Sequence, residues 1–161
     1  MLVRVAWLFC LAWLCGIPLA AQRAGSIGVA AVVQEPIAGT VLHALAFSVV
    51  APGAAVTVAT ASPSAGAFAV FGVTGHSVGL VFALPTELSL GVDSLSVGAW
   101  TGRWRADDPR AGTTFTPSDA ATPAVIGAEG SLVVLLGATV SPGASQPPGT
   151  YTGVAALTIL Y

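Results

Sequence analysis

Charged side chains are scarce in this chain of 161 residues. They make up 7% of it, where a soluble domain usually has about a quarter. All five cationic residues are arginines, and lysine is absent. Binding to nucleic acid or to an anionic membrane needs clustered positive charge that neutralises phosphate groups. The composition therefore excludes both kinds of partner.

Cysteine is confined to the first 21 residues, at Cys10 and Cys15. This segment has the order of a cleavable signal peptide: Arg4 supplies positive charge, an apolar stretch follows, and small residues precede Gln22. The apolar stretch is short for a transmembrane helix of about 20 residues. We expect a signal helix at 1–21 that is cleaved on export and leaves no membrane span; a retained anchor is the alternative. The mature chain would then have no disulfide.

The chain also lacks a sustained helical stripe of apolar residues. Instead, short apolar or alternating stretches are separated by turns rich in its 19 glycines and 11 prolines. This pattern predicts an all-β antiparallel sandwich or barrel. We expect residues 22–35 to be an N-terminal arm or first strand and residues 36–161 to be a single domain. The expected strands are 40–50, 54–60, 68–74, 78–84, 88–90, 95–104, 132–140 and 154–161, with a short one at 113–116 inside an exposed connection at 107–129.

No group of residues has the spacing of a catalytic or metal site. His43 and His76 have no carboxylate or thiol at the spacing of zinc ligands, and the G-x-S-x-G motif of serine hydrolases is absent. A calcium site at Asp107, Asp108 and Asp119 is conceivable, but these residues are more typical of a solvated loop. We therefore expect a protein that is not an enzyme, with no catalytic residue, no metal and no cofactor.

Trp100 and Trp104 are four residues apart on one expected strand, which places them on the same face. Two interpretations stay open. The indoles cover the core of the sheet, or they form an aromatic platform for a sugar or a partner strand. Exposure of both indoles would favour the platform.

Three stretches in a fixed order carry a family resemblance. The stretch Ala46–Val58 resembles an "L-x-F-G … G-x-V-T-V" pattern, although Ser48 stands where glycine is usual. Phe68–Gly75 followed by Leu84-Pro85 resembles "F-x-V-x-G … L-P". The ending Gly149–Gly153 with terminal Tyr161 resembles "G-x-Y-x-G … V-x-Y". Over residues 33–161 the chain thus resembles the secreted bacterial domain-of-unknown-function 4402 family, which is related to spore-coat-protein-U and fimbrial-subunit domains.

The resemblance implies an immunoglobulin-like antiparallel β-sandwich and a non-enzymatic structural or adhesive protein that reaches the cell surface, or is secreted, through the periplasm. It would be a pilus-like or coat-like subunit. In fimbrial subunits a neighbour's N-terminal arm adds a strand to an incomplete sandwich. Here the candidate arm is Ile27, Val29, Val32 and Val33, which could instead pair within its own domain. The resemblance places an assembly edge on the last strand, at Tyr151, Gly153, Leu157, Ile159 and Tyr161.

The implied partners are further copies of the chain or other surface subunits, with a periplasmic chaperone and usher. The alternative function is a self-contained secreted module that binds a ligand, such as a carbohydrate, through Trp100 and Trp104.

Overall fold

The structure is a computed structural model that describes residues 37–108 and 110–161. The expected signal segment at 1–21 and the candidate arm residues Ile27, Val29, Val32 and Val33 lie outside these residues. The described part contains ten β-strands and no helix. Every strand pairing in it is antiparallel. The prediction of an all-β antiparallel fold is confirmed.

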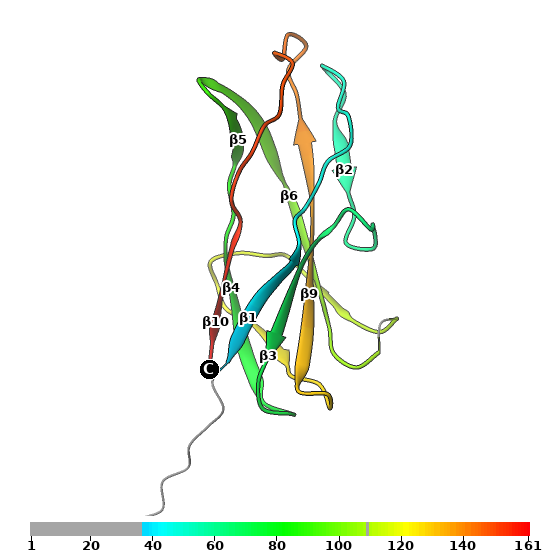
Figure 1. The fold of residues 1–161 in the computed structure, drawn as a ribbon, viewed down its shortest axis with the longest axis vertical. Helices are drawn as coiled ribbons and strands as arrows, with labels where there is room; N and C mark the ends of the chain where they lie inside the picture. Colours follow the sequence, from blue (N-terminus) through cyan, green and yellow to red (C-terminus); the bar gives the residue numbers. More distant parts are fainter. Residues whose placement is uncertain (1–36, 109) are drawn as a thin grey trace, which may run out of the picture. The chain divides into compact units, whose positions relative to one another are not determined.

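The strands form two sheets. The large sheet has the order β1 (Ala38–His43), β3 (Gly66–Phe71), β9 (Ser131–Ser141), β6 (Asp93–Arg105) and β5 (Glu87–Leu90). Two short strands extend it, β2 (Val56–Val58) beside β9 and β7 (Thr113–Phe115) beside β6. The small sheet has the order β10 (Ala156–Leu160), β4 (Ser77–Ala83) and β8 (Thr122–Val125). Figure 1 shows β6 and β9 as the two long strands that run side by side.

Alternating side chains from both sheets build the main core. Along β4, three apolar side chains are buried while Ser77 and Ala83 at its ends are exposed. These three pack in one cluster with alternate residues of β9. The buried residues of the two strands are Val78, Leu80, Phe82, Leu132, Val134 and Leu136. Since each fully buried apolar side chain of this size contributes about 1.5–3 kcal/mol, this shared cluster holds the two sheets together.

A second cluster lies under the other half of the large sheet, around Leu95, Val97 and Val140. No strand of the small sheet contributes to it. Loop side chains cover it instead, including Leu45 and Phe47 from the segment after β1. This explains why the predicted strand 40–50 is too long. β1 ends at His43, and the chain leaves the sheet so that Leu45 and Phe47 can cover the second cluster.

Two further features differ from expectation. His43, on the apolar phase of the predicted strand, is exposed, as is every other residue of β1. The segment 107–129 holds a second strand, β8, that the sequence analysis missed. Pro123 lies within β8, and a proline usually argues against a strand. β8 is an edge strand, however, where the missing N–H of proline is tolerated. The neighbouring Ala124 is buried in the main core.

Candidate functional site

An apolar groove separates the edge strands β1 and β10. It encloses about 280 Å³, and its lining comes from β1, from Phe68 of β3 and from the C-terminal segment. In the described part of the chain, β1 pairs only with β3 and β10 pairs only with β4. Each strand therefore has one edge without a partner strand. We call this feature the β1–β10 groove; its lining is Gly39, Thr40, Val41, Phe68, Ala155, Ala156, Leu157 and Ile159.

The segments that flank the groove are unusually apolar at their surface. On β10, Leu157 and Ile159 pack against the main core, whereas Ala156, Thr158 and Leu160 are exposed. Nine large hydrophobic side chains are exposed in the described residues, and six of them lie on the segments 38–50 and 151–161. Those six are Val41, Leu42, Val49, Val154, Leu160 and Tyr161. Exposed apolar surface that gathers beside open strand edges is typical of a place where another polypeptide binds.

The predicted assembly edge is divided by a change of sheet. Thr152 exchanges two backbone hydrogen bonds with Ser89 of β5, at 2.8 and 3.0 Å, which attaches this part of the chain to the large sheet. Four residues later, β10 pairs with β4 in the small sheet. Of the five residues predicted to form the edge, Leu157 and Ile159 line the β1–β10 groove.

The other three edge residues have separate contacts. Tyr151 packs against the second cluster, and its hydroxyl donates to the Pro147 carbonyl at 2.8 Å. Gly153 lies against Leu88, so closely that a Cβ atom there would be 2.7 Å from the Leu88 Cδ2 atom. The Tyr161 hydroxyl is 3.2 Å from Nδ1 of His76, in the turn between β3 and β4. This last contact fastens the end of β10.

The two tryptophans contact different parts of the core. A register shift between Gly98 and Thr101, with Ala99 at φ 47°, interrupts the regular alternation of β6. Trp100 packs against the second cluster and donates its Nε1–H to the Pro85 carbonyl at 3.3 Å. Trp104 packs against the main core, and its Nε1 is buried without a hydrogen-bond partner. Both indoles are partly buried, which agrees with the interpretation that they cover the core of the sheet.

Charged residues at the end of β6 and after it form hydrogen bonds within and around the following loop. Asp108 accepts a hydrogen bond from the Arg110 backbone N–H at 2.8 Å, and Arg103 donates to the Arg110 carbonyl at 2.6 Å. Asp107 accepts from the Glu129 N–H at 3.4 Å. Within residues 37–108 and 110–161, no three His, Cys, Asp or Glu side chains are grouped so that they could hold a metal ion. The three aspartates considered for calcium are therefore not brought together.

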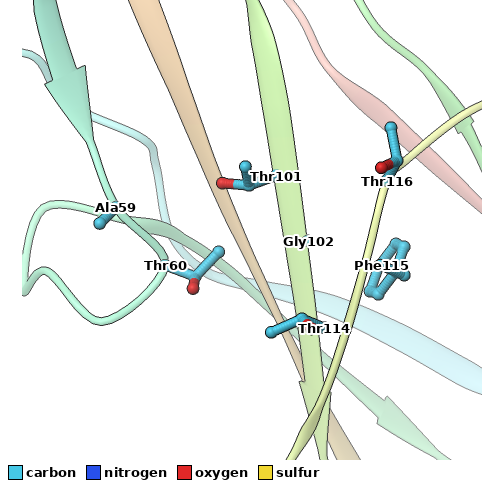
Figure 2. A pocket seen from close by; sticks show the side chains of 7 residues that line it. All are labelled: Ala59, Thr60, Thr101, Gly102, Thr114, Phe115 and Thr116. Atoms are coloured by element: carbon cyan, nitrogen blue, oxygen red, sulfur yellow. The ribbon is translucent and has the colours of Figure 1, made fainter.

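A second hollow lies on the large sheet, where residues of β6 and β7 and the segment after β2 come together (Figure 2). It measures about 490 Å³. Its lining is Ala59, Thr60, Thr101, Gly102, Thr114, Phe115 and Thr116. Sequence reasoning did not single out these residues, because they come from three segments that only the sheet topology brings together.

Comparisons with protein-family models, with curated proteins and with solved structures found no match for this chain. In the part of the chain that the structure describes, no helix has the length and hydrophobicity needed to span a membrane.

Proposed function

We propose that this protein is a non-enzymatic, exported structural or adhesive subunit, pilus-like or coat-like, whose β1–β10 groove receives a β-strand from another polypeptide. One observation carries the proposal: two strand edges without partners flank one apolar groove. Open edges present unpaired backbone N–H and C=O groups, and proteins normally cover them. A strand added here would bond to one of the two edges and place alternate side chains against the groove.

In this proposal the two sheets form an immunoglobulin-like sandwich that lacks one strand. The resemblance to the domain-of-unknown-function 4402 family belongs to the same proposal, as does export through the periplasm by way of a signal peptide at 1–21. The cysteine distribution supports export into an oxidising compartment, since residues 22–161 contain no thiol that could form an unwanted disulfide.

The strand that we propose for the groove is the arm 27–33 of a neighbouring copy. Its side chains Ile27, Val29 and Val33 are two or four residues apart, so that in an extended strand they share one face. Phe68, Leu157 and Ile159 offer that face an apolar surface. A periplasmic chaperone would hold the same groove before assembly, and an usher would guide the exchange.

A truncation experiment tests this proposal. We expect residues 22–161 to form oligomers in light scattering, and residues 36–161 to be monomeric with a lower melting temperature. A synthetic peptide of residues 22–35 should raise that melting temperature, because a ligand that binds only the folded state stabilises it. A matched peptide with Val29→Asp is the control and should have no effect. Oligomers would contradict an arm that pairs within its own domain, whereas a monomeric 22–161 whose stability survives truncation would refute strand addition.

A further inference from the structure

The small sheet carries no charged side chain. None of the residues of β4, β8 and β10 is an aspartate, glutamate, lysine or arginine. In the described part of the chain, all such residues lie between Glu87 and Glu129, outside these three strands. Charged residues make up about 25–35% of an ordinary soluble surface, but they are depleted at the centre of protein interfaces. The outer face of this sheet therefore has the composition of an interface.

Strand pairing fixes which side chains form this outer face. Val78, Leu80 and Phe82 of β4 are buried in the main core, so the alternate residues of β4 point outward. Residues paired across adjacent strands share a face, which assigns their partners on β8 and β10 to the same side. Two large apolar side chains on it are open to solvent, Val125 at 44% and Leu160 at 48% exposed. The outward residues used below are Gly79, Val81, Pro123, Val125, Thr158 and Leu160.

The centre of the face has no bulky or charged side chain. The outward residues of β4 are serine, glycine, valine and alanine. At Gly79 the neighbouring side chains come close together, since a Cβ atom there would be 3.3 Å from the Ala121 Cβ and 3.4 Å from the Leu160 Cβ. Two sheets stack face to face at about 10 Å when side chains of this kind meet.

The missing charge favours a second copy of this chain as the partner. A face with a net charge repels an identical face, because like charges are brought together. This face carries none, so two copies can meet through it. A two-fold axis would make the contact self-complementary, as is usual for pairs of identical chains.

The area sets the strength of such a contact. Three strands spaced at about 4.8 Å, with seven residues of about 3.4 Å each in β4, give a face of about 340 Å². A stable interface needs about 800 Å² from each partner. Two separate copies would therefore meet only briefly, whereas copies held close together in an assembly would gain from many such contacts at once.

We propose that two copies of this protein stack through the outer faces of their small sheets. Val125 and Leu160 would be covered by the partner sheet. The contact leaves the β1–β10 groove open, because Leu157 and Ile159 point to the inner side of β10. It is therefore independent of strand addition, and in an assembled polymer it would join neighbouring rows side by side.

Cysteine cross-linking of residues 22–161 tests the proposal, since this part of the sequence has no thiol. Thr158→Cys introduces one on the outer face, opposite Val81 of the central strand. With copper phenanthroline in air, the disulfide-linked dimer should form about tenfold faster than with Val92→Cys, because stacking raises the effective concentration of the two thiols. Position 92 is the matched control, as its side chain is fully exposed in the turn between β5 and β6. Non-reducing gels give the rates.

Arginine substitutions identify the face. Val125→Arg or Leu160→Arg, added to Thr158→Cys, should reduce the rate to that of Val92→Cys, because stacking would bring like charges together. Val92→Arg should leave the Thr158→Cys rate unchanged. An unchanged melting temperature shows that each variant is folded. The proposal is wrong if Thr158→Cys reacts no faster than Val92→Cys, or if neither face arginine slows it.

An arm variant separates this contact from strand addition. Val29→Asp should prevent the arm from joining copies, yet Thr158→Cys in that background should still cross-link faster than Val92→Cys. Loss of the difference would overturn stacking as an independent contact. If the difference persists while residues 22–161 prove monomeric by light scattering, the strand-addition proposal fails and the stacking proposal stands.

Discussion

Gly39 of β1 lies directly against Ile159 of β10. A Cβ atom at position 39 would be 3.1 Å from the Ile159 Cδ1 atom, which is tighter than an ordinary van der Waals contact. Both residues line the β1–β10 groove. At this point the Ile159 side chain bridges the gap between the two sheets. Because position 39 is a glycine, there is room for that side chain.

We predict that Gly39→Val obstructs the groove. The added methyl groups must displace Ile159 or fill the space beside Phe68, and overpacking of this kind typically costs about 1–3 kcal/mol. Binding of the 22–35 peptide, measured by fluorescence anisotropy, should weaken about tenfold if the lost contact is worth about 1.4 kcal/mol. Gly98→Val is the control, because a Cβ atom there would have no atom within 4 Å. Equal peptide binding by both variants would show that the peptide does not use the groove.

A second prediction tests the packing of the two sheets. Leu80 of β4 is fully buried, whereas Leu160, on the adjacent strand β10, is 48% exposed. Leu80→Ala should lower the free energy of unfolding by about 2–5 kcal/mol, because it removes buried contacts and leaves a cavity. Leu160→Ala should change it by less than about 1 kcal/mol. Urea unfolding of both variants measures the difference, and a similar loss in both would mean that the face of the small sheet is misassigned.

The third prediction concerns the two indole N–H groups. Trp100 donates to the Pro85 carbonyl, but the Trp104 Nε1 is buried without a partner. Trp100→Phe breaks a hydrogen bond, while Trp104→Phe removes a buried donor that costs about 1–3 kcal/mol when unsatisfied. Both changes lose a similar volume. We therefore expect Trp100→Phe to be the more destabilising by about 2 kcal/mol, measured by urea unfolding. The reverse order would indicate that the Trp104 N–H is satisfied in solution.

The strands that the sequence predicted well are those with a long apolar run. The nearly continuous apolar run at 78–84 predicted β4, and the run at 132–140 predicted β9, each to within one residue at each end. β8 was missed because it has only four residues and contains Pro123. Its strand conformation comes from pairing with β4 and from burial of Ala124, which are tertiary effects.

Part of the site could also be predicted from the sequence. The period of two in the last strand placed Leu157 and Ile159 on one face, and both line the groove. It could not show that Tyr151 and Gly153 lie beside β5, because the chain changes sheets between Thr152 and Ala156. Both Trp100 and Trp104 pack against the core, one of the two interpretations left open by the sequence, but the sequence could not show that they pack against two separate clusters.

The sequence by itself determined the all-β class, because short apolar or alternating stretches separated by turns are a local pattern. Only the tertiary structure decided which edges stay without a partner and which residues meet in a hollow. Strand order joins segments far apart in the chain, as Gly39 meets Ile159 and Thr60 lies near Thr114. The local pattern carries no information on that order, since the same alternation allows a strand to pair on either edge.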